Sequence, residues 1–211
     1  MNETQIKILE AAESEVADYG FAGASIRNIT QRAGVNVAAI NYHFGSKEEL
    51  IKALFRDRIK PINDYRLESL RKAQERAPDG IVSTEELVDI LVRPAVAKMM
   101  SKEGRRFVQA IARCMSEPTD FMCDLDEELF KEMFHSFLAA FQKALPEHDS
   151  ETLLNKMNFI ICSMVGFMMH FPRIEQLVGK QMSGEESEIL LDQYIDFIAT
   201  GIGSPVSSYS R

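Results

Sequence analysis

The sequence predicts an all-α protein, in which an N-terminal three-helix helix-turn-helix domain is joined by a long helix to a larger helical domain, giving about nine helices in all. Three observations lead to this expectation. Apolar residues recur three and four positions apart along most of the 211 residues, which is the spacing of one helical face. No segment shows the apolar–polar alternation of a half-buried strand. Residues 25–50 hold two short helical patterns, a sharp turn and the start of a third helix.

The first expected helix covers residues 4–19. Its apolar stripe consists of Ile6, Leu9, Ala12, Val16 and Tyr19. Gly20 predicts the end of this helix, because glycine tolerates the backbone conformation that follows a helix. Phe21 is expected to fill the small core beneath the unit that comes next.

The second expected helix follows Ser25, whose hydroxyl can accept a backbone N–H at a helix start. Ile26, Ile29 and Ala33 then form one apolar stripe. Gly34 suits the left-handed conformation at the helix end. The residues therefore predict a short helix and a tight turn.

A third short helix is expected from about Val37 to Phe44, with Asn36 as its N-cap. Ile40 and Phe44 lie four apart and are expected to face the core. The opposite face is small and partly polar, which suits a helix that enters a major groove of DNA. That face consists of Val37, Ala38, Asn41 and Tyr42.

The fourth helix is expected to begin after Gly45. Ser46 and Glu49 have the spacing of a capping box. Lys47 falls in the first turn, where a positive charge is poorly placed against the helix dipole. A phosphate lying across this helix start would explain the lysine.

These residues resemble the DNA-binding domain of the TetR family of bacterial transcriptional regulators. The likeness covers roughly the first quarter of the chain and is carried by Ile8–Ala12, Gly20-Phe21, Ser25–Ile29, Ala33-Gly34-Val35 and Tyr42–Leu50. It departs at Asn41, where many members carry a second aromatic residue, and at Val37, where many carry a basic or small one. Without this motif, a plain helical hairpin inside an all-α domain would be the preferred interpretation.

The resemblance implies that the chain binds a double-stranded DNA operator, forms a homodimer and responds to a small-molecule effector. The residues expected to contact DNA are Ser25, Arg27, Asn36, Val37, Ala38, Asn41, Tyr42, His43 and Lys47. The departures at Val37 and Asn41 mean that the operator sequence cannot be taken from a relative.

The rest of the chain is also helical in pattern. The fourth helix is expected to run to about Arg76, kinked at Pro61. Further helices are expected over residues 84–100, 102–115, 118–146, 150–171 and 187–202. The expected division is a DNA-binding domain at 1–48, a regulatory and dimerisation domain at 49–203 and a polar tail at 204–211. The long helix that starts at Ser46 is expected to be the only connection between the two domains.

Two of these helices are apolar on more than one face, those around Met157–Met169 and Leu190–Ile202. The resemblance favours a four-helix bundle formed with a second copy, and a buried central pair in a monomer is the alternative. The expected dimer contacts are Ile161, Val165, Met168, Leu191, Tyr194, Ile195 and Ile198.

The chain has a formal net charge of -8, yet residues 1–60 carry eight basic and eight acidic side chains. The excess of acid therefore lies after residue 60, and modest nonspecific DNA affinity is expected. Cys114, Cys123 and Cys162 form no metal pattern and suggest reduced, buried thiols in the cytoplasm. No signal peptide is evident. The most apolar run, 159–171, is too short for a membrane span.

No arrangement of residues typical of an enzyme, a metal site or a cofactor is visible. Eleven methionines and thirteen phenylalanines leave a pocket for a flexible apolar molecule possible, although methionine at helical spacing is more often plain core. The family resemblance favours such a pocket, and the wording of residues 41–50 resembles a branch that includes lipid-responsive members, which implies a lipid-like ligand. Candidate pocket residues are Met100, Phe107, Ile111, Met115, Phe134, Phe137, Met164 and Met168. Arg106 and Arg113 lie seven apart and could hold a carboxylate, or could simply be solvated.

Two hypotheses stay open at this stage. The first is a dimeric repressor released from its operator by a small apolar or lipid-like ligand. The second is a DNA-binding protein of the same fold that is controlled by a protein partner and has no small-molecule pocket.

Overall fold

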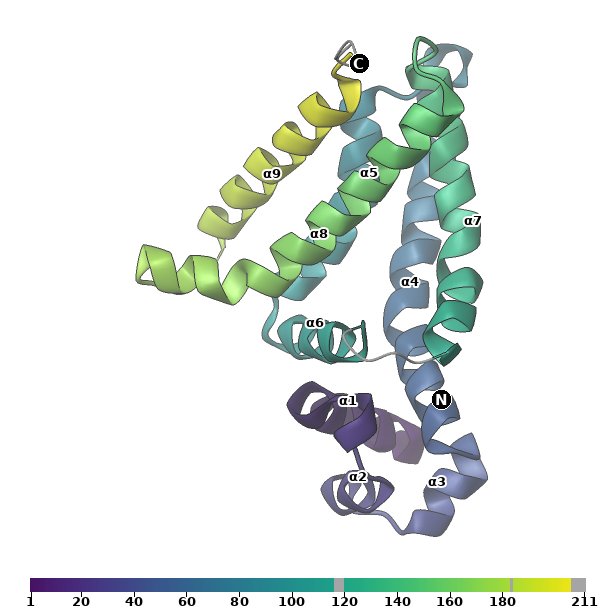
Figure 1. Cartoon of the computed structure of the whole chain (residues 1–211), viewed down its shortest axis with the longest axis vertical. Coiled ribbons are helices and arrows are strands. Elements are labelled where there is room, and N and C mark those ends of the chain that lie inside the picture. The colour runs from purple at the N-terminus through teal and green to yellow at the C-terminus, as the bar shows by residue number, and fades with distance from the viewer. Residues whose placement is uncertain (116–119, 183, 206–211) are drawn as a thin grey trace, which may run out of the picture. The chain divides into compact units, whose positions relative to one another are not determined.

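The computed structural model describes residues 1–115, 120–182 and 184–205. These residues form nine α-helices and one short 3-10 helix, with no strand among them, and the all-α prediction is confirmed (Figure 1). The helices are α1 (Glu3–Gly23), α2 (Ile26–Ala33), α3 (Val37–Phe44), α4 (Lys47–Arg76), α5 (Thr84–Met100), α6 (Lys102–Met115), α7 (Asp120–Ala144), α8 (Ser150–Val178) and α9 (Glu185–Gly203), and the 3-10 turn is Pro78–Gly80.

Two helices run further than their sequences predict. α1 was expected to stop at Tyr19, but one more helical turn follows Gly20, which interrupts the helix with φ 74° and ψ 177°. α8 was expected to stop near Phe171, but it passes through Pro172 and ends at Gly179, a left-handed C-cap with φ 75°. A proline removes one backbone hydrogen bond from a helix, and here that loss does not end the helix. The expected start of α7 at Pro118 lies outside the described residues.

The chain divides into two compact units, which are described separately. The first unit contains residues 1–62 and 101–131, and the second contains residues 63–100 and 132–211. α4 and α7 each contribute residues to both units. The expected domain boundary at residues 48/49 falls in the first turn of α4, and it remains a proposal about which part acts on DNA.

The first unit is built around one apolar cluster. Ile8, Ile29, Ile40 and Leu54 are each 0% exposed and come from α1, α2, α3 and α4 in turn. Burying large aliphatic side chains is the main source of stability for such a small helical unit. The position of α3 is therefore fixed through Ile40 by three other helices.

α6 belongs to this first unit as well. It packs along α1, and the rings of Phe55 and Phe107 meet edge to face at 5.6 Å between centroids. Arg106 Nη1 donates to Ser14 Oγ at 2.8 Å. The helix that begins at Ser46 was expected to be the only connection between the two domains. This expectation is wrong, because α6 also packs against α1. Sequence periodicity identifies the apolar face of α6 but not the helix against which it packs.

The second unit contains α5, α8, α9 and the later parts of α4 and α7. α5 packs on α9, and Arg93 of α5 pairs with Asp89 of its own helix at 2.7 Å and with Asp192 of α9 at 2.7 Å. α8 is 29 residues long and, by length and mean hydropathy, could cross a membrane, yet only 22% of its most apolar window is buried inside the chain. Much of the apolar surface of α8 is therefore exposed in a single copy.

Candidate nucleic-acid interface

α2 and α3 are bounded by side-chain caps and one glycine. Ser25 Oγ accepts the backbone N–H of Asn28 at 3.1 Å, and Asn36 Oδ1 accepts that of Ala39 at 2.9 Å. Gly34 adopts φ 68° and ψ 31°, which favours glycine. Ser25 and Asn36, both expected at the DNA surface, thus hold the ends of two helices.

α3 has one buried face and one exposed face, as its sequence pattern predicts. Ile40 is 0% exposed, whereas Val37 is 47% and Tyr42 is 85% exposed. Ala38 and Asn41 are also exposed. His43 is half-buried, and its ring lies edge-on to that of Tyr42 at 5.0 Å between centroids. The four side chains expected to read bases therefore share the accessible side of one short helix.

A buried acid that sequence reasoning missed fixes α2 on α1. Glu15 is 0% exposed, and its carboxylate accepts from Asn28 Nδ2 at 2.7 Å and lies 3.1 Å from Arg32 Nε. Arg32 also donates to Asp18 at 2.8 Å. The sequence signal that could have revealed Glu15 is an acidic residue on the apolar side of α1, because a buried acid is rarely left unpaired and so predicts a basic or polar partner.

Lys47 does not extend into solvent. Its ammonium donates to the backbone carbonyls of Phe21 at 2.8 Å and Ala24 at 3.0 Å, and it lies 4.5 Å from the centroid of the Phe21 ring. A lysine in the first turn of α4 is thus explained by contacts within the chain. The expected phosphate contact of Lys47 stays a prediction.

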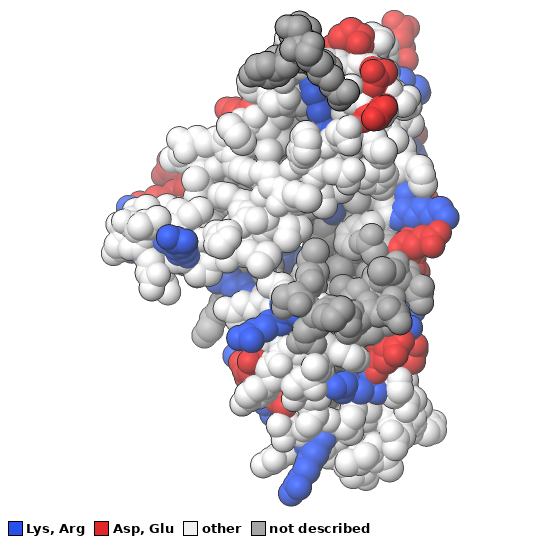
Figure 2. Space-filling model, in the orientation of Figure 1, with Lys and Arg blue, Asp and Glu red and all other residues white. Residues whose placement is uncertain are grey.

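Arg27 is differently placed. It is exposed on α2, and its guanidinium has no hydrogen bond or ion pair to any residue that the structure describes, although its backbone carbonyl accepts from Thr30 Oγ1 at 2.8 Å. By contrast, Lys52 and Arg58 pair with acids of their own unit, Lys52 with Glu48 at 2.8 Å and Arg58 with Glu13 at 2.8 Å. Figure 2 shows little charge over α2 and α3 on the visible face. Arg27 is therefore a cation available to a phosphate at no cost to the fold.

The candidate pocket residues are divided between the two units. Phe107 is buried and Ile111 half-buried in the first unit, and the Met115 side chain lies outside the described part. Those in the second unit are Met100, Phe134, Phe137, Met164 and Met168, of which Phe137 and Met164 are buried. Arg106 and Arg113 are both exposed in the first unit. A pocket made by this set stays a prediction.

Several residues expected at a dimer interface are buried within one chain instead. Leu191, Tyr194, Ile195 and Ile198 are 0%, 9%, 5% and 6% exposed. Ile161, Val165 and Met168 are half-buried. Tyr194 donates its hydroxyl proton to Ser163 Oγ at 3.0 Å and stacks on Phe167 at 4.5 Å between centroids. These α9 residues therefore hold α9 against its own subunit.

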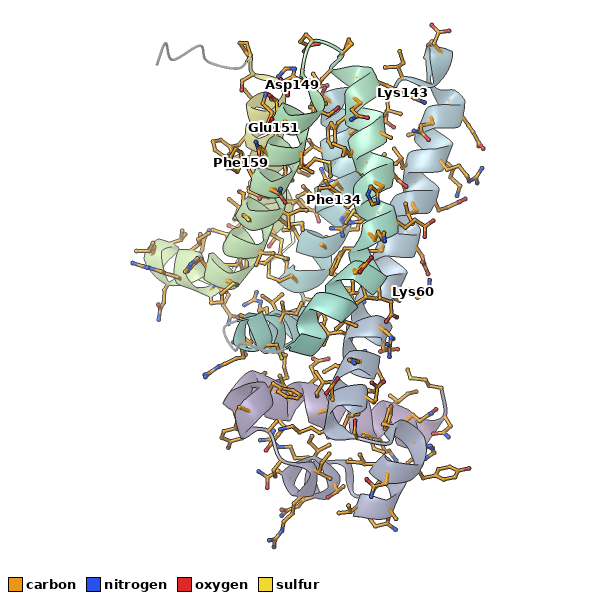
Figure 3. The ribbon with its side chains drawn as sticks, turned by 45° about the vertical axis from the view of Figure 1, so that its right-hand side comes forward. Lys60, Phe134, Lys143, Asp149, Glu151 and Phe159 are labelled. Carbon is orange, nitrogen blue, oxygen red and sulfur yellow. The ribbon has the colours of Figure 1, made fainter. Side chains whose placement is uncertain are left out.

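The exposed apolar side chains of α8 and α9 are different ones. Phe159 is 69% exposed and Phe197 71%, and Figure 3 shows Phe159 pointing outward from α8. Cys162, one helical turn after Phe159, is exposed too, whereas Cys114 is buried. The expectation of buried thiols is wrong for Cys162. Periodicity revealed that both helices are apolar on two sides, but not which side packs inside the chain.

Comparison with known proteins gives two family matches along the chain. Residues 8–54 match the bacterial regulatory proteins of the tetR family. Residues 89–201 match the tetracyclin repressor-like C-terminal domain. The first match covers most of α1, all of α2 and α3 and the start of α4, and the second runs from within α5 to near the end of α9.

Curated relatives and solved structures agree with these matches. The chain is 28% identical over 126 residues to a probable HTH-type transcriptional regulator, ArpR, from Pseudomonas putida, covering 60% of this chain and 57% of that protein. It is 33% identical over 88 residues to the HTH-type transcriptional repressor AcnR of Corynebacterium diphtheriae, covering 42% and 40%. The chain thus spans about half the length of the curated relatives it matches. The fold resembles that of the transcriptional regulator FadR from Bacillus subtilis, crystallised with stearoyl-CoA, with a TM-score of 0.65, 14% identity and coverage of 93% and 98%.

Proposed function

We propose that this chain, which belongs to the TetR family of bacterial regulatory proteins, is a homodimeric repressor that binds a palindromic operator and is released by a small apolar or lipid-like molecule. The observation that carries the proposal is the accessible side of α3. Small Ala38 permits close approach to base edges, and the amide of Asn41 can bind adenine with two hydrogen bonds. Such a regulator acts in the cytoplasm, where bacterial DNA lies.

A dimer is supported by the apolar surface that α8 and α9 leave exposed. Phe159 and Phe197 each expose more than two thirds of their surface, and an exposed apolar patch of large side chains can mark a protein–protein contact. A second copy would cover them and relate two α3 helices by a two-fold axis. Recognition helices about 34 Å apart can enter successive major grooves of one operator.

The effector class is supported by the interior of the second unit. Its buried residues are mostly aliphatic, aromatic and methionine side chains, among them Phe137, Phe141, Met157 and Met164. Methionine adapts its shape to flexible apolar molecules. An effector that prefers one arrangement of the dimer can weaken operator binding only by its differential affinity for the two arrangements.

Selection of bound sequences from random DNA, followed by light scattering of the selected complex, tests this function. We expect a palindromic sequence bound by two copies of the chain. Recovery of no preferred sequence, or of a site occupied by one copy, would contradict the proposal. Thermal-shift screening of apolar compounds then tests release, since a ligand at 100 times its Kd adds about 2.7 kcal/mol of stability.

A protein partner remains the second candidate, because the last turns of α8 are also apolar and exposed. Leu177 is 79% exposed and Val178 50%. In this case the dimer would bind its operator, no compound class would release it, and Leu177→Ser would abolish regulation in cells without changing operator affinity in vitro.

A further inference from the structure

The interior of the second unit contains an arginine. Arg66, on α4, is 2% exposed, although its neighbours Tyr65 and Leu67 are more accessible. Burial lowers the pKa of the Arg66 guanidinium to about 10, because a charged group loses its hydration inside the protein. At neutral pH the side chain is still a cation.

The contacts of Arg66 do not neutralise this charge. Nη1 donates to the amide oxygen of Asn63 at 3.0 Å, and Nη2 lies 3.6 Å from the sulfur of Met164. Nε is buried and has no hydrogen-bond partner. No carboxylate of the described residues pairs with Arg66. A buried unpaired cation is costly, so an arginine at this position needs a reason beyond packing.

Two other arginines of the chain show what the Nε–Nη2 edge of a guanidinium binds when a carboxylate is near. Arg56 places Nε and Nη2 on the two oxygens of Glu128, each at 2.7 Å. Arg71 holds Glu68 in the same way, at 3.0 and 2.7 Å. Both are far more exposed than Arg66. In Arg56 and Arg71, at the surface, the Nε–Nη2 edge binds a carboxylate side-on. In Arg66, in the interior, this edge has only the thioether of Met164 beside it.

Among the described residues of this unit, the buried acid is Glu175, and it is already engaged elsewhere. Glu175, near the end of α8, accepts the backbone N–H of Met182 at 2.9 Å. The exposed arginines considered from the sequence, Arg106 and Arg113, lie in the first unit. Both are exposed, and an exposed cation gains less from an anion than a buried one does.

We infer that the Nε–Nη2 edge of Arg66 is the binding point for the carboxylate of a small apolar acid, which is the effector of this regulator. This inference rests on the proposed ligand response and names its chemical class. A carboxylate carries the one negative charge that a single guanidinium can balance, and its two oxygens match this edge. The apolar remainder of the acid would lie against the methionine, aliphatic and aromatic side chains that fill the unit.

The test compares matched ligands on the full-length dimer. Dodecanoate and 1-naphthoate serve as acids, with dodecan-1-ol and 1-naphthol as neutral analogues, and binding is measured by calorimetry and thermal shift. For at least one pair we expect the acid to bind the unmodified protein at least tenfold more tightly than its neutral analogue. Arg66→Met should remove this preference while binding of the neutral analogue changes less than twofold. Arg106→Met, which removes an exposed arginine of the first unit, should keep it.

Arg66→Met should also raise the melting temperature of the ligand-free protein, because it replaces an unpaired buried cation with an apolar side chain of similar length. If this variant does not fold, Arg66→Lys keeps the charge, loses the side-on edge and should still weaken acid binding at least tenfold. Equal binding of acids and neutral analogues, or an acid preference that survives both substitutions, would overturn the inference. If the unmodified protein selects no operator, the proposed function fails instead, whatever the acids do.

Discussion

The ammonium of Lys47 donates a hydrogen bond to the carbonyl oxygen of Phe21 at 2.8 Å and lies over the ring of the same residue at 4.5 Å from its centroid. A second bond reaches Ala24 at 3.0 Å. The first turn of α4 is thereby joined to the end of α1, directly before α2. The lysine that the sequence suggested for a phosphate thus bonds to the segment directly before α2.

Lys47→Met is therefore expected to destabilise the protein. The two carbonyls would lose a charged donor, which costs roughly 1–3 kcal/mol when no other donor replaces it. Denaturant unfolding measures the loss. Arg27→Ala is the matched control and should leave stability within about 0.5 kcal/mol of wild type, because it removes an exposed side chain with no hydrogen bond or ion pair to a described residue. If Lys47→Met is as stable as wild type, the two hydrogen bonds of Lys47 do not stabilise the fold, and a phosphate contact is the remaining explanation for this lysine.

Arg27→Ala should weaken binding to all DNA sequences about equally. Loss of one phosphate contact reduces the dependence of log affinity on log salt by about one unit. Fluorescence anisotropy on operator and random DNA, at several salt concentrations, gives both slopes. A slope equal to that of the wild-type protein would show that Arg27 lies away from the DNA.

Asn41→Ala should alter which sequence is preferred. Its amide is exposed on α3 beside Ala38 and Tyr42, and losing a bidentate base contact costs about 1–3 kcal/mol of discrimination at one base pair. Repeating the selection from random DNA with this variant should relax one position in each half-site. Arg27→Ala, passed through the same selection, should return the wild-type motif. An unchanged motif for Asn41→Ala would contradict the assignment.

Phe197 and Ile198 are neighbours on α9 with opposite surroundings, 71% and 6% exposed. Phe197→Asp should give folded monomers, because the charge replaces a ring that only a second copy would cover. Ile198→Asp should unfold the chain, because it buries an unpaired charge among its own helices. Light scattering gives the mass and circular dichroism gives the melting curve. If Phe197→Asp stays dimeric, the proposed interface is misplaced.

A folded monomer is not guaranteed for Phe197→Asp, because some dimers have no stable monomer. If Phe197→Asp does not fold, the wild-type melting temperature shows whether folding depends on the dimer. If it rises with protein concentration, loss of folding in Phe197→Asp still reports loss of the dimer. If it does not, unfolding of this variant contradicts the assignment of Phe197 to the interface.

The pair between Arg56 of α4 and Glu128 of α7 predicts a pH effect. The hydrogen bond from Arg56 holds the pKa of the Glu128 carboxyl below its usual value of 4.5. A carboxyl with a lowered folded-state pKa stabilises the protein above its unfolded-state pKa, and this stability is lost as pH falls through the folded-state pKa. Glu128→Gln should thus cost about 0.2–1 kcal/mol at neutral pH and nothing in strong acid. Glu132→Gln, at an exposed position with no ion pair to a described residue, is the control and should change the stability at neutral pH by less than about 0.5 kcal/mol.

The sequence by itself determined that the chain is helical and that α2, a tight turn and α3 follow one another. Ser25, Gly34 and Asn36 act on residues within a few positions of themselves, so their types and spacing suffice to predict two capped helices and a tight turn. The sequence also predicts that Ile40 lies on the buried face of α3 and that Val37, Ala38, Asn41 and Tyr42 lie on its exposed face, because the helical period fixes which residues share a face.

Only the tertiary structure decided which partners those faces meet. Lys47 bonds to carbonyls 23 and 26 positions earlier in the chain, and Arg66 is buried beside Met164, 98 positions later. α9 has two apolar sides, and packing of the subunit hides Ile198 while leaving Phe197 exposed. Contacts between distant segments depend on how several helices fill space together, and a local pattern of residue types carries no record of that choice.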